Sequence, residues 1–316
     1  MRREHNDDSV AAFVPATVAN LGPGFDVLGL AIDGPGDTVR ARIAPQGKPG
    51  VTIAQIHGDQ GRLPREADAN TAGIAATHTL RRAGLELAVE LELTKGLPIG
   101  SGLGSSASSA VAAAFAVNLL IGSPLRKEEL VAPCVEAEAV VAGRHADNVA
   151  PALLGGLILV RSVEPLELVR LPVPDGLFVV VNTPDFELNT RAAREALPSE
   201  VSMRDMVTHS AQLAALVSAC YSGDLGLLAD SLVDPVVTPA RIGLVPGGAE
   251  AIAAARGAGA LGASLSGSGP SIFALCHSPV VAAEVATRMR TAFSDAGLES
   301  SVVISPANNP GARRIP

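Results

Sequence analysis

The sequence contains no tryptophan, and its only tyrosine is Tyr221. Aromatic residues make up 3% of the 316 residues and charged residues 18%, whereas hydrophobic residues make up 47%. A large buried core can therefore form, and disorder over the whole chain is excluded. Because aromatic side chains are so scarce, alanine, valine, leucine and glycine must fill that core. Such small residues favour layered helices and sheets whose backbones approach closely.

Long apolar runs are also missing. The longest, at residues 108–121, is interrupted by Ser109 and Asn118 and is shorter than the roughly 20 residues that a membrane-spanning helix needs. The first ten residues, MRREHNDDSV, are charged and lack the apolar segment of a secretory signal. These absences predict a cytoplasmic protein without a membrane partner, and residues 1–8 are predicted to form a disordered leader.

Cysteine is scarce, and positive charge is outnumbered by negative charge. Cys134, Cys220 and Cys276 are far apart in apolar surroundings, which predicts buried, free thiols in a reducing compartment. The formal net charge of −8 repels nucleic-acid phosphates and anionic lipids, so neither is an expected partner. An anionic substrate would need a local binding device, because the overall field does not attract it.

Hydrophobic periodicity predicts a chain that alternates strands and helices. Strands are expected at residues 10–14, 27–32, 39–43, 51–56, 87–94, 157–160, 177–181, 271–275 and 301–304. Helices are expected at residues 70–83, 127–141, 190–196, 203–221 and 248–258, and after the glycine- and serine-rich segment at 98–109. The length allows two domains, and the alternation is compatible with both mixed classes of fold.

Turn-forming residues indicate loops, and a stretch without clear helix or strand periodicity indicates a domain boundary. Residues 15–26 and 57–69 are expected to be loops, and the tail at 307–316 is expected to be loose. The stretch at 162–172 shows no strong element. It therefore sets the boundary between two predicted domains, residues 9–165 and residues 166–308.

The strongest local signal is the segment PIGSGLGSSASS at residues 98–109, between the strand expected at 87–94 and an alanine-rich helix. Its alternate glycines, Gly100, Gly102 and Gly104, permit backbone conformations that a side chain would forbid, and they let N–H groups face an anion. Serine hydroxyls and the unpaired N–H groups of the first helical turn add donors. The segment is predicted to bind polyphosphate without a lysine.

Two other phosphate loops are disfavoured for this segment. No Gly-Lys-Ser/Thr follows it, so it is not a Walker A motif, and its glycines run GxGxG rather than GxGxxG. A flexible linker or an ordinary capped turn remains as the alternative. The position of the segment directly between a strand and a helix argues against a linker.

Three segments together resemble the GHMP kinases, a superfamily that includes galactokinase and the mevalonate and homoserine kinases. PIGSGLGSSAS at residues 98–108 is similar to their phosphate loop, and ASLSGSGPS at 263–271 is similar to their C-terminal glycine-rich motif. PATVANLGPGFD at 15–26 resembles the N-terminal motif of homoserine kinases in particular. The resemblance covers roughly residues 10–305, and three motifs in the right order make it specific.

The resemblance implies an α+β, two-domain GHMP kinase fold. Its N-terminal, ATP-binding domain would be similar to ribosomal protein S5 domain 2, with a left-handed βαβ crossover. A ferredoxin-like α+β domain would follow, with the active site between the two. A homodimer is common in such families, although no pattern in these residues indicates one.

The implied reaction is the ATP-dependent phosphorylation of the hydroxyl of L-homoserine to O-phospho-L-homoserine, in threonine biosynthesis, with Mg²⁺ as metal cofactor. The phosphate loop would hold the ATP. The loop residues implied in this role are Pro98, Ile99, Gly100, Ser101, Gly102, Leu103, Gly104, Ser105, Ser106, Ala107 and Ser108.

Homoserine is a zwitterion with a primary hydroxyl, so its site needs a carboxylate for the ammonium and a cation for the carboxylate. By resemblance, Asn20 and Asp26 of the first motif hold this substrate, with Asp26 near its ammonium or its hydroxyl. Asp26 is also the residue proposed to assist deprotonation, and a turn cap is its alternative role. His145 and Asp147 match an H-x-D-N segment of the substrate pocket.

A second group of substrate residues lies in the C-terminal half. Thr190 and Arg194 match an S-T-x-x-x-R segment, and Arg241 matches a D-x-x-x-x-P-x-R segment. Two arginines suit the bidentate capture of a carboxylate. A surface role is the alternative for Arg194, and His209 is a weaker substrate candidate.

The resemblance also implies a Mg²⁺ site made by a phosphate-loop serine and a glutamate. Ser106 is chosen as the serine, with Ser105 as its alternative. The glutamate usually lies eight residues before the histidine of the H-x-D-N segment, a position that Ala137 occupies here. Glu138 is chosen in its place and Glu136 is the alternative, and a sparse protein site of this kind suits Mg²⁺.

Two alternative functions remain open from the sequence. Another GHMP kinase, of the mevalonate or shikimate type, would share the phosphate loop, but mevalonate lacks the ammonium that Asp26 and Asp147 could bind. A non-catalytic protein that senses an amino acid would keep the fold with a broken phosphate loop, whereas this loop is intact. No lysine is expected to act as a base or as a phosphate clamp, and Lys95 has no assigned role.

Overall fold

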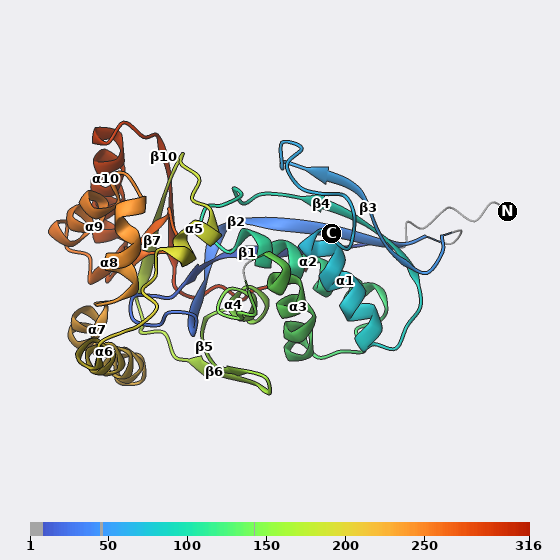
Figure 1. Cartoon of the computed structure of the whole chain (residues 1–316), viewed down its shortest axis with the longest axis horizontal. Helices are drawn as coiled ribbons and strands as arrows, with labels where there is room; N and C mark the ends of the chain where they lie inside the picture. The colour runs from blue at the N-terminus through green and yellow to red at the C-terminus, as the bar shows by residue number, and fades with distance from the viewer. Residues whose placement is uncertain (1–8, 45–46, 142) are drawn as a thin grey trace.

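The computed structural model describes residues 9–44, 47–141 and 143–316, apart from the side chain of Thr190. The leader predicted at residues 1–8 lies outside this set. The described chain forms a seven-stranded sheet and a four-stranded sheet. The elements up to β6 lie at one end of an elongated molecule, and most of those from β7 to α10 lie at the other (Figure 1).

The seven-stranded sheet has the order β11-β1-β2-β4-β3, and β5 and β6 extend it from β2. Only the β3–β4 pair is parallel. Its strands are β1 (Ser9–Ala19), β2 (Leu28–Ile43), β3 (Gly50–His57), β4 (Ala88–Thr94), β5 (Leu157–Val163), β6 (Leu166–Leu171) and β11 (Arg313–Ile315).

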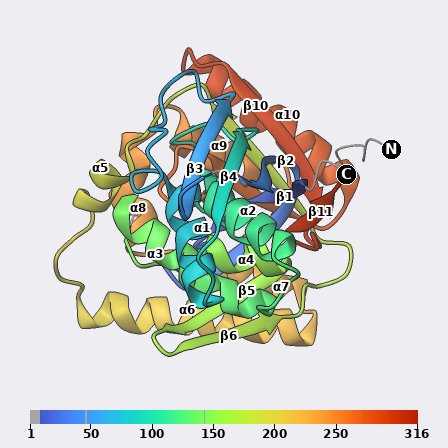
Figure 2. The same ribbon diagram turned by 90° about the vertical axis from the view of Figure 1, so that its right-hand side faces the viewer.

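A layer of helices packs on this sheet, and Figure 2 shows the end of the molecule where α1, α2 and α3 lie beside β3 and β4. The layer consists of α1 (Thr71–Arg82), α2 (Ser105–Leu120), the 3-10 helix η1 (Lys127–Leu130), α3 (Val131–Val141) and α4 (Val149–Leu154). Helix α2 is apolar on all sides, and residues 107–118 are all buried. A helix of this kind belongs in the middle of a core, where its first turn is held rigidly.

The four-stranded sheet is antiparallel throughout, in the order β10-β7-β9-β8. Its strands are β7 (Phe178–Pro184), β8 (Gly262–Leu265), β9 (Ile272–Cys276) and β10 (Ser300–Pro306). The helices of this half are α5 (Thr190–Glu195), α6 (Met203–Ser222), α7 (Leu225–Ser231), α8 (Val237–Arg241), the 3-10 helix η2 (Ile242–Leu244), α9 (Gly248–Gly257) and α10 (Pro279–Asp295).

Alternate residues of β7 enter two different cores. Val180 packs with the inner faces of α9 and α10. Val179 and Val181 pack in a cluster that also contains Leu28 and Leu30 of β2 and residues of α6 and α7. Because side chains alternate along a strand, β7 joins both cores at once. The two sheets therefore share one apolar cluster, which fixes their relative position.

Several predicted elements are confirmed to within one residue at each end. They are the helices at 70–83, 203–221 and 248–258, which correspond to α1, α6 and α9, and the strands at 51–56, 87–94 and 271–275, which correspond to β3, β4 and β9. The three cysteines are buried and free, as predicted. Within the described ranges, every helix is too short or too polar to cross a bilayer.

Two predictions about the first strands are wrong. Residues 15–19 continue β1, and the strands expected at 27–32 and 39–43 are one strand, β2. The intervening GPG segment reads as a turn, but it is accommodated by a bulge in which residues 32–35 of β2 lie opposite Ala16 of β1.

Strand pairing explains the other differences. The stretch at 162–172 is part of the β5–β6 hairpin, and the tail is not loose, because Arg313–Ile315 pairs with β1 as β11. Helices α4, α7, α8 and α10 and strand β8 have no counterpart among the predicted elements, although β8 overlaps the 263–271 motif. The domain division at residue 165 stays a prediction.

Candidate active site

A cavity of about 500 Å³ is lined by residues from every motif singled out in the sequence. Both halves of the chain contribute to its wall. The contributing segments are the first motif, the phosphate loop, α3, the loop at 145–148, the segment at 187–194, Arg241, and the glycine-rich loop at 267–268.

The phosphate loop adopts the backbone conformation expected from its glycines. Gly100, Gly102 and Gly104 have φ values of 71°, 76° and 68°, in the left-handed region that favours glycine. Gly104 also directly precedes α2, and a Cβ at this position would run into Thr17 Oγ1 and Asn148 Oδ1. A side chain is therefore excluded at Gly104 by both conformation and space.

The carbonyl groups of the loop bond outward to neighbouring segments. Ser101 O accepts from the amide and the hydroxyl of Ser271, at 3.2 and 2.7 Å. Gly102 O accepts from Ser266 Oγ at 2.8 Å, and Leu103 O accepts from an amide of β1 at 3.1 Å. The N–H groups of the first turn of α2 have no acceptor within the helix. This combination suits the binding of an anion at the start of α2.

A buried carboxylate lies beside the start of α2. Ser106 Oγ donates to Glu138 Oε2 at 3.0 Å, and the other carboxylate oxygen, Oε1, is buried without a hydrogen-bond partner in the described chain. Burial raises the pKa of Glu138 to about 7, and the Ser106 hydrogen bond opposes that rise. An unpaired buried oxygen next to a phosphate loop fits the ligand set that Mg²⁺ prefers.

The alternative metal ligands point elsewhere. Glu136 bonds to Arg144, with contacts of 2.9 and 2.7 Å, and is partly exposed. Ser105 Oγ donates back to Leu97 O at 3.3 Å. The sequence left both alternatives open, and the geometry brings Ser106 and Glu138 together on the cavity wall.

The predicted substrate residues of the first motif form a charged cluster with Arg194 and His145. The carboxylate of Asp26 accepts from both terminal nitrogens of Arg194 at 3.2 Å and lies 3.4 Å from His145 Nδ1. Asn20 orients Asp26, because its Oδ1 accepts from the Asp26 amide at 3.1 Å while its Nδ2 donates to Gly267 O at 2.9 Å. Burial lowers the pKa of His145, which favours the neutral ring at pH 7.

Arg241 is almost fully buried below this cluster. Its Nε donates to Ala193 O at 2.7 Å and its Nη1 donates to Gly267 O at 3.3 Å. Phe25 contacts both arginines, with its ring centroid 5.2 Å from the Arg241 guanidinium and 5.6 Å from that of Arg194. Phe25 has no role in the sequence-based prediction, although it lies in the PGFD end of the first motif.

A second buried carboxylate, Asp147, completes this end of the cavity. It is 4% exposed, and burial, together with the charge of Asp26, raises its pKa to about 7. Its neighbour Asn148 accepts from Thr17 Oγ1 at 2.7 Å through Oδ1, which ties the segment to β1. The cavity therefore holds two carboxylic acids that titrate near neutral pH.

Some of the predicted site residues lie away from the cavity wall. Leu103 and Ala107 are buried in the two cores, and Ser108 Oγ donates to Val14 O at 3.0 Å under the helix. Pro98 accepts a hydrogen bond from Ser101 Oγ through its carbonyl. These four positions support the loop from behind or flank it.

Two further predicted residues are placed as follows. The weaker candidate His209 does not line the cavity, and its Nδ1 lies 3.7 Å from Asp234. The side chain of Thr190 lies outside the described residues. Every other predicted site residue belongs to the cavity wall.

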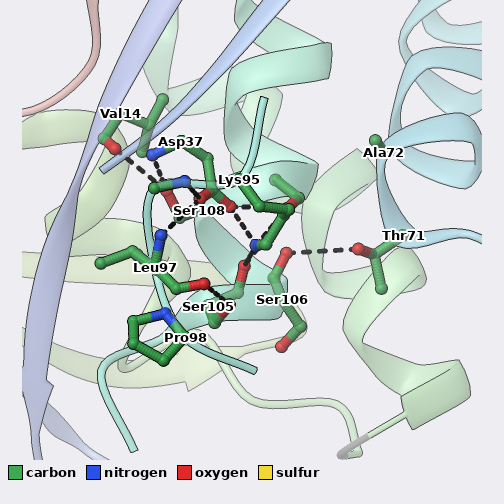
Figure 3. Close-up of polar contacts among 12 residues, drawn as sticks. Val14, Asp37, Thr71, Ala72, Lys95, Leu97, Pro98, Ser105, Ser106 and Ser108 are labelled. Atoms are coloured by element: carbon green, nitrogen blue, oxygen red, sulfur yellow. Dashed lines mark hydrogen bonds and ion pairs between the residues drawn. The ribbon is translucent and has the colours of Figure 1, made fainter. Parts of the chain in front are cut away.

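Two groups that support the site were not predicted. A buried ion pair between Asp37 and Lys95 lies beneath the phosphate loop (Figure 3). Asp234 caps α8, where it accepts from the amides of Val236, Val237 and Thr238, and so it anchors the helix that carries Arg241. A lysine three residues before the loop was the only visible signal for the ion pair.

Comparison with known proteins agrees with this geometry. The family described as GHMP kinases N terminal domain matches residues 70–156, and the one described as GHMP kinases C terminal matches residues 216–295. The homoserine kinase of Chlorobium phaeobacteroides (strain BS1) is 42% identical over 97% of this chain and 99% of its own. That of Arabidopsis thaliana is 45% identical over 97% of this chain and 85% of its own.

A solved structure gives the same result for the fold. The crystal structure of homoserine kinase from Cytophaga hutchinsonii ATCC 33406 matches with a TM-score of 0.95 and 43% identity, and the match covers 100% of both chains. The two-domain GHMP kinase fold expected from the sequence is thereby confirmed. This chain belongs to the homoserine kinase family of the GHMP kinases.

Proposed function

We propose that the protein transfers the γ-phosphoryl group of ATP to the hydroxyl of L-homoserine and forms O-phospho-L-homoserine. The names of its relatives support this substrate. The observation that carries the proposal is the arrangement of the cavity. A glycine-rich loop at a helix start lies at one end, and a carboxylate with two arginines lies at the other.

The phosphate end of the cavity is proposed to hold ATP together with Mg²⁺. Backbone amides of the loop and the positive end of α2 would bind the phosphates. Ser106 and Glu138 would hold the metal, which neutralises charge on the transferred group when it is bound. The unpartnered Oε1 of Glu138 and its raised pKa support this role, because a nearby cation would favour the charged carboxylate.

The amino-acid end of the cavity is proposed to hold homoserine. In the ligand-free chain Asp26 and Arg194 neutralise each other. A zwitterion can take over both partners, with its ammonium on Asp26 and its carboxylate on Arg194 and Arg241. Phe25 contacts both guanidinium groups, which supports their placement at the same end of the cavity.

Catalysis is proposed to come from alignment and charge stabilisation rather than from a strong base. No lysine of the described cavity wall is placed as a base, because the Lys95 ammonium bonds to Asp37, Ser105 and Ser109. Holding the hydroxyl in line with the γ-phosphate converts the transfer into an effectively unimolecular step. Asp26 orients the amino-acid end and is the proposed aid to deprotonation.

The test is ADP release with ATP, Mg²⁺ and one alcohol at a time. Homoserine, mevalonate and shikimate form the panel. We expect homoserine-dependent ADP release and no more than background with the other two. Turnover with mevalonate equal to that with homoserine, or none with homoserine, would contradict the proposal.

A further inference from the structure

The ion pair under the phosphate loop is more deeply buried than any other charged pair described in the chain. The side chain of Lys95 is 2% exposed and that of Asp37 is 0% exposed. The pair lies beside the first turn of α2 (Figure 3), where Lys95 and Ser109 also reach the wall of the cavity. The family resemblance assigned it no role, and the proposed reaction does not use it directly.

All three donors of the Lys95 ammonium are used within this cluster. They contact Asp37 Oδ2, Ser105 O at 2.9 Å and Ser109 Oγ at 2.8 Å. Ser109 Oγ also donates to Asp37 Oδ2 at 2.7 Å. The lysine therefore holds the first turn of α2 and has no donor left for a phosphate.

Asp37 holds the other end of the same loop. Its Oδ1 accepts from the amides of Gly96 and Leu97, at 3.0 and 3.2 Å, where the chain leaves β4. Its own amide lies 3.3 Å from Ser108 Oγ in α2. One carboxylate thus bonds to the entry of the loop directly and to its exit through Lys95 and Ser109.

The bulge in β2 brings Asp37 to this place. Residues 32–35 lie opposite Ala16, and pairing resumes at Gly36, next to the aspartate. The backbone of Gly96 approaches Gly36 so closely that a Cβ at Gly96 would run into Gly36 O. The exit of β4 therefore sits directly against the carboxylate.

A buried ion pair is an unfavourable way to gain stability alone, because desolvation of both charges offsets their attraction. What this pair supplies is a fixed set of donors and acceptors for backbone groups at both ends of a loop rich in glycine. Such a loop has large conformational freedom, which must be removed before its amides can converge on an anion.

We propose that Asp37 and Lys95 are positioning residues that hold the phosphate loop in its anion-binding conformation and thereby set the affinity for the phosphates of ATP without touching them. This inference rests on the proposed function, since ATP is taken as the ligand of the loop. It predicts that disrupting the pair weakens nucleotide binding and leaves homoserine binding unchanged, because other segments form the homoserine site.

The test compares Lys95→Met with the wild type in binding of a non-hydrolysable ATP analogue and in initial rates. A misplacement of about 1 Å can cost roughly 100-fold, so we expect Kd for the analogue and KM for ATP to rise about 10- to 100-fold. KM for homoserine should stay within about twofold, because positioning acts on one end of the cavity.

Lys127→Met is the matched control. Lys127 is a partly buried lysine that contacts Phe115 of α2, and its ammonium donates to Leu153 O and Ala312 O, away from the loop. The same substitution there should change thermal stability and leave Kd for the analogue unaltered. Equal loss of nucleotide affinity in both variants would overturn the inference.

Ser109→Ala tests the same cluster with little risk to folding. Alanine suits the interior of α2, and the change removes the hydroxyl that lies between Lys95 and Asp37. We expect a smaller rise, about threefold, in the same two constants, as for loss of one hydrogen bond. Should Lys95→Met not fold, this variant decides the question.

Three further outcomes would overturn the positioning role. One is an unchanged Kd for the analogue in folded Lys95→Met or, if that variant does not fold, in Ser109→Ala. Another is an equal rise in KM for ATP and in KM for homoserine. The third is a large loss in Lys95→Met with none in Ser109→Ala, which would indicate direct contact between the ammonium and phosphate. If the wild type binds the analogue but releases no ADP with homoserine, the proposed function fails while the positioning test still stands.

Discussion

Replacing Glu138 with glutamine should stabilise the ligand-free fold at pH 8 and remove most of the turnover. Burial raises the pKa of this carboxyl from its usual 4.5 to about 7. Because the folded-state pKa is raised, the wild type loses stability as pH rises from about 4.5 through 7. Glutamine has nearly the same shape, can keep the contact with Ser106, and carries no charge to desolvate.

The magnitude follows from the shift. At about 1.4 kcal/mol for each pKa unit, the charged Glu138 costs the fold about 3 kcal/mol at pH 8. One polar group of the new amide would be buried without a hydrogen-bond partner, at the place where Oε1 now has none. This costs about 1–2 kcal/mol and offsets part of the gain. The net gain should be on the order of 1–2 kcal/mol at pH 8. It should vanish near pH 5, where the wild-type carboxyl is protonated.

The assay is the thermal unfolding midpoint at pH 8 and pH 5 without Mg²⁺, together with kcat at saturating ATP. Loss of a proposed metal ligand should lower kcat by about 100- to 1000-fold, as for other groups that stabilise transition-state charge. Glu136→Gln is the matched variant on the same helix. Its exposed pair with Arg144 contributes at most about 1 kcal/mol, so both readouts should change little.

One result would refute the reasoning about Glu138. If Glu138→Gln is less stable than the wild type at pH 8 and retains kcat within about threefold, the buried carboxylate is a structural group and not a metal ligand. If Glu136→Gln shows the loss of turnover instead, the metal ligand is the other glutamate.

Three further variants test the rest of the cavity. Arg241→Leu should raise KM for homoserine about 100-fold in initial-rate kinetics, as expected for loss of a charged bidentate contact of roughly 3 kcal/mol. KM for ATP should stay nearly unchanged, and an equal rise in both KM values would contradict the assignment. Asp234→Asn should weaken the cap of α8 by about 1 kcal/mol and raise KM for homoserine about fivefold, because α8 carries Arg241. An unchanged KM would show that the cap does not influence homoserine binding. Gly104→Ala should place a methyl group against Thr17 and Asn148 and abolish measurable binding of an ATP analogue in calorimetry, so normal binding would show that the start of α2 can shift.

Local signals predicted much of the fold and one end of the cavity. The phosphate loop was predictable because its features are local: glycines at alternate positions, serines, and a helix directly after them. The helices α1, α6 and α9 were predictable for the same reason, since their apolar faces repeat at helical spacing. The homoserine end was accessible only through resemblance, because its residues are spread from position 20 to position 241.

The limits of local pattern appear in β2 and in the tail. A GPG segment inside a strand reads as a turn unless a neighbouring strand is known to tolerate a bulge, and here β1 does so. The three residues of β11 are a strand only because β1 offers a free edge more than 290 positions earlier in the chain. Neither pairing leaves a mark in the local sequence.

The sequence alone predicted a lysine-free polyphosphate loop, an apolar helix behind it, and a set of charged groups suited to a zwitterion. Only the tertiary structure decided which of these groups meet. Residues 136 and 138 lie about 200° apart around a helix, so one of the two must turn away from any given surface, and packing of α3 against α2 turned Glu138 inward. The structure likewise joined Asp37 to Lys95 and placed Phe25 against two arginines, because contacts between distant residues depend on how sheets and helices pack and not on spacing along the chain.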